Sequence, residues 1–239
     1  MPLLDYDALT FDCYGTLIDW ETGLVRAVRE TLPGVDRPER EILETFARFE
    51  PEEESAAPDL VYPEILARVH GRLAAEWGLP ADEANAKVFG ASVKDWPAFA
   101  DSPAALQILK QHYRLVILSN VDRQSFSASQ ERLGVKFDFI YTAQDIGSYK
   151  PDPRIFSFMI ERLGAEGIPK EKILHTAESL YHDHVPARSF GLANCWIYRQ
   201  HDQEGFGATR PPGEDVKTDF RFNSLAEMAD AVTAEAAQR

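Results

Sequence analysis

The stretch Leu9–Asp19 reads L-T-F-D-C-Y-G-T-L-I-D. The apolar run Ala8–Phe11 ends at the carboxylate of Asp12 and enters a turn at Gly15, which is typical of a buried strand that ends at a sheet edge. An aspartate in this position can act as a nucleophile, because the turn exposes its oxygens and the glycine lets a ligand come close. Taken alone, the pattern also fits an ordinary turn or cap residue.

Similar apolar runs recur along the chain and alternate with helical patterns. A helix is expected from Ser102, which precedes a proline, to about Tyr113, and another from Asp152 to Gly164. The alternation predicts an α/β fold, a Rossmann-like doubly wound parallel sheet with helices on both faces and ligands at the carboxyl ends of the strands. The expected strands are Ala8–Phe11, Leu115–Leu118, Phe139–Thr142, Ile173–Thr176, Ala193–Tyr198 and Phe220–Phe222.

Residues 21–99 interrupt this alternation, because they contain helical patterns and no convincing strand. We expect an inserted helical cap, so that the chain divides into a core of residues 1–20 and 100–239 and a cap of residues 21–99. The acidic run Glu50–Glu54 is expected to be a solvated loop between two cap helices. Residues 200–218 are rich in glycine, proline and charge, and are expected to form a long surface loop.

The composition argues against several kinds of partner. The chain has 239 residues and a formal net charge of -14 without a basic cluster, so we expect neither nucleic acid nor an anionic membrane as a partner. No stretch reaches the roughly 18 apolar residues of a membrane span, and the first residues lack a secretory pattern. The two distant cysteines, Cys13 and Cys195, favour free thiols and a cytoplasmic location.

Polar residues follow the predicted strands and should gather at one edge of the sheet. Asp12 follows the first strand, and Ser119 with Asn120 follows the second. Asp183 lies beyond the fourth strand, where it can act as the base for a water. Lys150 lies in a loop that should join them, and its positive charge would keep Asp12 ionised.

Four ordered motifs resemble those of the haloacid dehalogenase superfamily, and the resemblance covers nearly the whole chain. The motifs are F-D-C-Y-G-T at Phe11–Thr16, L-S-N at Leu118–Asn120, Y-K-P-D at Tyr149–Asp152 and the acidic cluster that ends at Asp183. The resemblance implies that Asp12 is the covalent nucleophile and that Thr16 and Ser119 orient it and the substrate. Lys150 would then be the neutralising lysine, and Asp183 would be the acid of the fourth motif.

Tyr14 stands where most phosphatases of this superfamily carry a second aspartate, which protonates the leaving alcohol and helps to bind magnesium. A phenol with an ordinary pKa of about 10 is a poor proton donor at neutral pH. The D-x-Y-G-T pattern resembles the type II 2-haloacid dehalogenases, which displace halide from carbon without a metal. The resemblance therefore implies no metal and no cofactor, although Tyr14 could also simply pack against the cap.

The fourth motif departs from the type II pattern S-x-N-x-x-D, because Glu178 and Leu180 replace the serine and asparagine. An added carboxylate suits a substrate that also carries a positive charge. Four stretches resemble the L-azetidine-2-carboxylate hydrolases, type II relatives that open a strained cyclic amino acid: F-D-C-Y-G-T-L-I-D-W-E-T-G, T-A-Q-D-I-G-S-Y-K-P, H-T-A-E-S-L-Y-H-D-H and D-F-R-F-N-S. This resemblance predicts hydrolysis of L-azetidine-2-carboxylate to 2-hydroxy-4-aminobutyrate through an ester of Asp12.

Three other functions remain open: an (S)-2-haloacid dehalogenase that releases halide and a 2-hydroxy acid, a magnesium-dependent phosphatase, and a non-catalytic binding module. The sequence also leaves open whether the chain forms a homodimer. For both functions that act at C2, the azetidine hydrolase and the haloacid dehalogenase, the expected partner is a small-molecule carboxylate.

Six residues are candidates for contact with that carboxylate substrate. Arg48, on a cap helix, could hold the substrate carboxylate through its guanidinium fork, or it could be a solvated arginine. Trp20, at the entry to the cap, could face a cationic nitrogen or pack in the core. The remaining candidates border the proposed site and are Tyr14, Asn120, Tyr149 and Glu178.

Overall fold

A computed structural model describes residues 1–201, 213 and 216–239 of the protein. Its centre is a six-stranded sheet in the order β3-β2-β1-β4-β5-β6, in which all neighbouring strands are parallel. The strands are β1 (Ala8–Phe11), β2 (Arg114–Ser119), β3 (Phe139–Thr142), β4 (Ile173–Ala177), β5 (Ala193–Ile197) and β6 (Phe220–Phe222). The predicted fold class is confirmed, and no strand end differs from its expected position by more than one residue.

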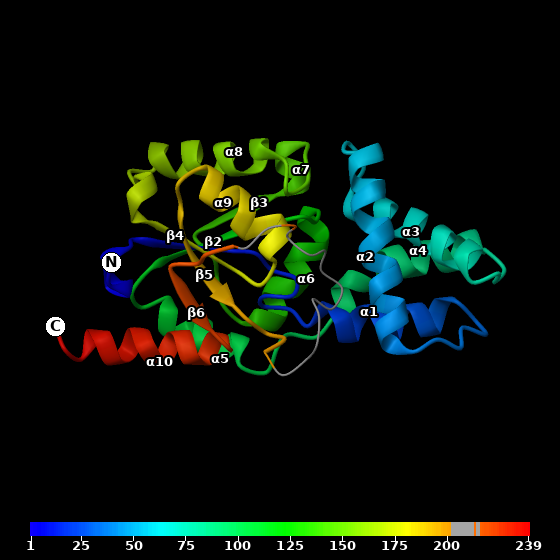
Figure 1. Ribbon diagram of the computed structural model, residues 1–239, viewed down its shortest axis with the longest axis horizontal. Helices are drawn as coiled ribbons and strands as arrows, with labels where there is room; N and C mark the ends of the chain where they lie inside the picture. The colour runs from blue at the N-terminus through cyan, green and yellow to red at the C-terminus, as the bar shows by residue number, and fades with distance from the viewer. Residues whose placement is uncertain (202–212, 214–215) are drawn as a thin grey trace.

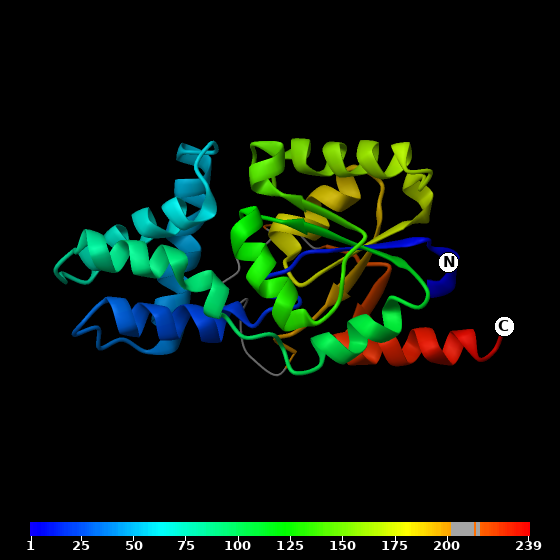
Figure 2. The same cartoon turned by 180° about the vertical axis from the view of Figure 1, so that it is seen from behind.

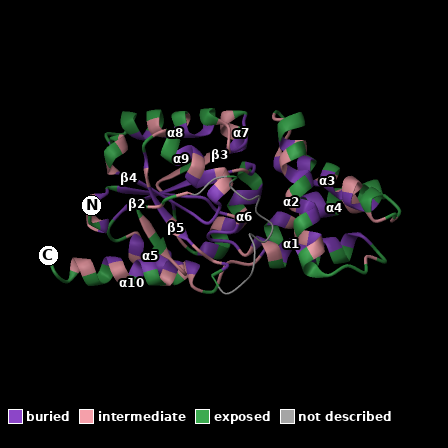
Figure 3. Cartoon of the chain, in the orientation of Figure 1, coloured by how far each residue is buried: buried purple, intermediate pink, exposed green. Residues whose placement is uncertain are grey.

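Helices cover both faces of the sheet (Figure 1). Alternate residues of β2 face the two layers, because successive side chains of a strand point in opposite directions. Val116 packs in the cluster that contains α8, whereas Leu115 packs in the cluster that contains α5 and α10. The helices of the core are α5 (Ser102–Leu109), α6 (Arg123–Leu133), α7 (Ala143–Ile146), α8 (Pro153–Ala165), α9 (Val185–Ser189) and α10 (Leu225–Ala236). Buried residues concentrate on the strands and on the helix sides toward them (Figure 3).

Four helices lie together beyond one end of the sheet, and both chain termini lie at the other end (Figures 1 and 2). They are α1 (Trp20–Thr31), α2 (Glu39–Ala56), α3 (Tyr62–Glu76) and α4 (Glu83–Gly90), followed by the short 3-10 helix η2 (Ala91–Asp95). Gly23 permits close packing of α1, because a Cβ atom there would lie 2.4 Å from Trp96.

The chain passes between the sheet and these helices twice, at adjacent places. Ile18 and Ala98 form an antiparallel bridge, and the Asp19 amide donates to the Pro97 carbonyl at 2.8 Å. These crossings coincide with the expected ends of the inserted segment. The division into a core of residues 1–20 and 100–239 and a cap of residues 21–99 stays a prediction.

The expectation of a solvated loop at Glu50–Glu54 is wrong. These residues continue α2, and the side chains of Glu50 and Glu54 are buried. The reason is helical spacing, since residues four apart lie on one face. The buried face that begins with Ile42 and Phe46 therefore continues into these two glutamates.

Three further expectations concern the end of α8, the loop at residues 200–218 and the two cysteines. The helix α8 continues through Gly164 and ends at Ala165. Most of the surface loop expected at residues 200–218 lies outside the described residues. Cys13 and Cys195 are both buried free thiols. In the described part of the chain, no helix has the length and apolar character needed to cross a membrane.

Candidate active site

Three charged side chains meet at the carboxyl edge of the sheet. The Lys150 Nζ atom donates hydrogen bonds to Asp12 Oδ1 at 2.7 Å and to Asp183 Oδ1 at 2.8 Å. All three side chains are at least nine-tenths buried. Thr16 Oγ1 donates to the other carboxylate oxygen, Asp12 Oδ2, at 2.8 Å. The structure thus brings together four of the residues that the motifs single out, and both oxygens of Asp12 are oriented.

Backbone contacts fix the two chain segments that carry this ion pair. Asp12 directly follows β1, and its amide donates to the Thr176 carbonyl at 3.1 Å, which extends the pairing with β4. The side chain of Asn120 binds the backbone of Lys150 twice. Its Oδ1 accepts from the Lys150 amide at 2.6 Å, and its Nδ2 donates to the Lys150 carbonyl at 3.1 Å. Asn120 therefore positions the lysine.

His175 also belongs to this network, although no sequence motif pointed to it. It is fully buried on β4, with Nε2 at 2.9 Å from Asp183 Oδ1 and Nδ1 at 2.9 Å from Thr10 Oγ1. A carboxylate can only accept, so Nε2 donates to Asp183, and Nδ1 accepts from the threonine hydroxyl in the neutral ring. The signal that could have found it is strand register, because Thr10 and His175 are direct partners across β1 and β4.

The two aspartates have opposite pKa shifts. Burial tends to raise the pKa of Asp183, but Lys150 and His175 outweigh it and hold that pKa well below the usual range. For Asp12, burial outweighs Lys150, and the charge of Asp183 adds to the effect, so its pKa lies above the ordinary value. Burial lowers the pKa of Lys150, yet the two carboxylates raise it more. The lysine therefore stays charged, and Asp12 is the carboxylate that gains a proton first as the pH falls.

A cavity of about 60 Å³ opens on this network, between the strand ends and the helices α2 and α3. Ser119 and Asp183 line it, and neither Ser119 Oγ nor Asp183 Oδ2 has a hydrogen-bond partner in the described part of the structure. The lining residues are Asp12, Tyr14, Trp20, Glu50, Glu54, Tyr62, Ser119, Asn120, Val121, Lys150, Ser179, His182 and Asp183. Among the described residues, no three His, Cys, Asp or Glu side chains are grouped to hold a metal ion.

Two glutamates of the cavity, Glu50 and Glu54, come from the acidic run whose pattern predicted a solvated loop. Burial raises the pKa of Glu50 to about 7, although its hydrogen bond from Tyr62 acts in the opposite direction. Burial, with the charge of Glu50, raises the pKa of Glu54 well above its ordinary value. The i, i+4 phase with Phe46 was the signal that could have placed them here.

Tyr14 lines the cavity but cannot replace the missing acid. Its hydroxyl is 2.8 Å from Ser129 Oγ, and its ring packs edge-on against Trp96 with centroids 5.7 Å apart. Burial raises the pKa of Tyr14 well above its ordinary value, which makes the phenol a still weaker acid. Trp20 also lines the cavity and packs against Phe46. Both roles considered for these aromatic residues, packing and contact with a ligand, fit their positions.

Three of the expected substrate contacts, Arg48, Tyr149 and Glu178, do not line this cavity. Arg48 lies on the outer side of α2, where it pairs with Glu76 at 2.7 Å and its side chain is 51% exposed. It precedes Glu50 by two residues, and a separation of two places side chains on different faces of a helix. Tyr149 is buried, but its hydroxyl donates to the Leu60 carbonyl at 2.6 Å. Tyr149 therefore joins the loop after α2 to the core.

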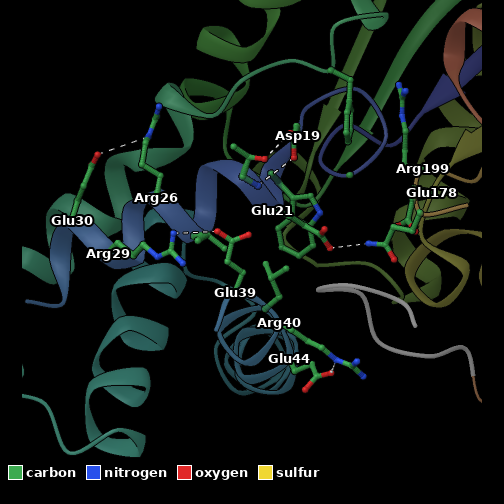
Figure 4. A pocket seen from close by; sticks show the side chains of 17 residues that line it. Asp19, Glu21, Arg26, Arg29, Glu30, Glu39, Arg40, Glu44, Glu178 and Arg199 are labelled. Carbon is green, nitrogen blue, oxygen red and sulfur yellow. Dashed lines mark hydrogen bonds and ion pairs between the residues drawn. The ribbon is translucent and has the colours of Figure 1, made fainter. Parts of the chain in front are cut away.

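Glu178 lines a second cavity of about 730 Å³, beside α1 and α2 (Figure 4). Arg199 and Gly15 also border this space. The backbone of Glu178 contributes to the first site, because its amide donates to Thr16 Oγ1 at 2.9 Å. The side chain is not among the residues that line the smaller cavity, so the expected contact between Glu178 and a substrate ammonium group is not supported there.

Known proteins provide a comparison with this geometry. The (S)-2-haloacid dehalogenase H-109 of Pseudomonas putida is 27% identical over 233 residues, which cover 94% of this chain and 96% of that protein. A 5-amino-6-(5-phospho-D-ribitylamino)uracil phosphatase of Escherichia coli is 27% identical over 208 residues, covering 82% and 85% of the two chains. The structure of the L-2-haloacid dehalogenase from Xanthobacter autotrophicus matches with a TM-score of 0.77 and 18% identity, covering 95% and 98%. The family model of haloacid dehalogenase-like hydrolases matches residues 6–176, and the chain therefore belongs to this family.

Proposed function

We propose that this hydrolase forms a covalent ester between Asp12 and C2 of a small carboxylate, without a cofactor, and that L-azetidine-2-carboxylate is its substrate. The observation that carries the reaction class is the buried contact of Asp12 with Lys150 and Thr16 at the wall of a small cavity. Tyr14 stands beside it in place of a carboxylic acid, so the chemistry must release its leaving group without that acid.

In the first step an Asp12 oxygen attacks C2, and the C2–N bond of the ring breaks. The electron pair of that bond goes to the nitrogen, which enters the site as a protonated ammonium group and leaves as a neutral amine. Release of ring strain favours the step, and no general acid is needed. Thr16 and Lys150 each hold one oxygen of Asp12, so the carboxylate does not have to be oriented during the reaction.

In the second step water attacks the Asp12 carbonyl carbon, and the bond from that carbon to the ester oxygen breaks. One proton of the water ends on the leaving oxygen, which gives the 2-hydroxy acid, and the other passes to the product amine. Lys150 stabilises the charge that develops on the carbonyl oxygen. Asp183 Oδ2 has no other partner in the described structure and can accept a hydrogen bond from the water. Its low pKa suits positioning of the water better than storage of its proton.

The charge of the cavity supports the zwitterion over a simple anion. Four acidic side chains and one lysine line it, and the described lining residues include no arginine. Burial raises the pKa values of two of them, Glu50 and Glu54, and a cationic group beside them favours their ionised form. A 2-haloacid brings only negative charge to such a site, whereas L-azetidine-2-carboxylate also brings a positive one. The second candidate function, (S)-2-haloacid dehalogenase, is supported by the relative from Pseudomonas putida.

The test is parallel turnover of L-azetidine-2-carboxylate and L-2-chloropropionate with a chelator present, following 2-hydroxy-4-aminobutyrate and chloride. The Asp12→Asn variant is the blank. We expect ring opening without chloride release. Chloride release alone would assign the protein to the haloacid reaction. Turnover of p-nitrophenyl phosphate with magnesium, and of neither carboxylate, would contradict both and favour a phosphatase.

A further inference from the structure

The proposed reaction gives no role to two buried side chains, Glu50 and Glu54. They lie one turn apart on α2, and both line the cavity onto which Asp12 opens. Glu50 is 7% exposed and Glu54 is 4% exposed. Glutamate is rarely buried to this extent without a paired cation.

The hydrogen bonds of these two glutamates leave acceptor capacity unused. Glu50 accepts from the Tyr62 hydroxyl. Among the described residues Glu54 accepts only from Asn120 Nδ2, at 3.3 and 3.4 Å, whereas a carboxylate has about four acceptor positions. Neither glutamate forms an ion pair with a described residue. By contrast, their neighbour Glu52 pairs with Arg72 on the outer side of the helix.

A second observation shows that this space is suited to a ligand. Ser119, at the end of β2, lines the same cavity and is 3% exposed, and its hydroxyl has no hydrogen-bond partner in the described structure. A serine hydroxyl can donate to a carboxylate, and a glutamate can accept from an ammonium group. The cavity therefore offers a match for both charged groups of a small amino acid.

We propose that Glu54, supported by Glu50 and Tyr62, binds the ammonium group of the substrate. This inference rests on the proposed function and assigns to α2 the recognition that the sequence alone suggested for Glu178. The N–H donors of the ammonium group fill the free acceptor positions of Glu54, and its charge compensates a carboxylate that is otherwise buried alone. Glu54 thereby selects substrates that carry a cationic nitrogen near the reacting carbon.

The experiment measures binding in the full chain that carries Asp12→Asn, so that turnover does not interfere. Calorimetry gives the Kd of L-azetidine-2-carboxylate and of cyclobutanecarboxylate, a ring of the same size without nitrogen. We expect the nitrogen to strengthen binding at least tenfold. Adding Glu54→Gln should reduce this preference to less than threefold, whereas adding Glu52→Gln, the same change on the outer side of α2, should leave it intact.

Equal affinity of the Asp12→Asn protein for the two rings, or no binding of either, would overturn the inference before any variant of Glu50 or Glu54 is made. A preference that survives in folded Glu50→Gln/Glu54→Gln protein would overturn it as well, with circular dichroism as the check on folding. A preference that depends on Glu54, in a protein whose wild type does not open the ring, would leave the subsite standing and remove the proposed reaction. Ring opening by the wild-type protein, with an unchanged KM in Glu54→Gln, would leave the proposed reaction standing and remove the subsite.

Discussion

The cavity has two walls, and each carries two buried carboxylates. The core wall holds Asp12 and Asp183, and the cap wall holds Glu50 and Glu54. On the core wall one lysine, Lys150, contacts both aspartates within 2.8 Å. The cap wall has no cation among the described residues, and its partners are a phenol and an amide.

This difference separates a preorganised part of the site from an incomplete one. A buried ion pair with good geometry compensates much of the cost of taking its charges out of water, and the core wall meets that condition before any ligand binds. Buried carboxylates without a cation favour the protonated form instead, as the raised pKa values of Glu50 and Glu54 indicate. The core wall is therefore complete for chemistry, while the cap wall is completed by a ligand.

The largest expected effect comes from breaking the core wall with Lys150→Gln. The change leaves Asp12 and Asp183 buried without their cation, so we expect a loss of about 3 to 5 kcal/mol in the free energy of unfolding. Turnover should fall by about 10³-fold or more, because the lysine also stabilises the developing oxyanion. Thermal unfolding and steady-state kinetics measure both. The control is Lys87→Gln, which removes a lysine from an exposed pair with Glu83 and should change neither quantity.

Glu50→Gln on the cap wall should have the opposite sign. With a folded-state pKa of about 7 and an ordinary value of 4.5, Glu50 holds a proton that the unfolded chain loses as the pH rises through that range, so stability declines. Glutamine can still accept a hydrogen bond from Tyr62, and because it does not titrate, it removes this decline of stability with rising pH. We expect a gain of about 3 kcal/mol at pH 8 and almost none at pH 4, measured by urea unfolding. Lower stability of the variant at pH 8 would contradict this account, and Glu52→Gln is the matched control.

The smallest expected effect is a shift in a pH profile. Ester formation needs ionised Asp12, whose raised pKa sets the acidic limb of the rate. The charge of Asp183 is one cause of that raised pKa, so Asp183→Asn should move the limb to lower pH, by up to about one unit. Single-turnover release of the leaving group isolates this step from ester hydrolysis. An acidic limb that moves to higher pH would show that the charge of Asp183 does not raise the pKa of Asp12.

Much of the core wall could be predicted from the sequence, because it depends on local patterns with a fixed geometric consequence. Parallel strands bring their carboxyl ends to one edge, so Asp12 and Ser119 had to lie at the same edge of the sheet once their strands were recognised. His175 was missed although its strand was expected. Its contact with Thr10 depends on the order of β1 and β4 in the sheet, which residue patterns do not state.

The cap wall could not be read so easily, because an acidic run usually indicates solvent. Helical phase separates Glu50 and Glu54, on the buried face, from Arg48, on the outer side, and it becomes decisive only once α2 is known to continue to Ala56. The side chain of Glu178 was assigned to the substrate from its motif position. Its direction depends on the chain path after β4, where Ser179 caps a short π-helix, Leu180–His184.

A covalent ester of Asp12 is tested by a single turnover in H₂¹⁸O, with enzyme in excess over whichever carboxylate is hydrolysed. If Asp12 attacks C2 and water then attacks the Asp12 carbonyl carbon, the first product molecule carries unlabelled oxygen at C2, and ¹⁸O appears in the Asp12 carboxylate. Mass spectrometry of the product and of the peptide that contains Asp12 measures both. ¹⁸O in the product hydroxyl after the first turnover, with Asp12 unlabelled, would show direct attack by water and contradict the account.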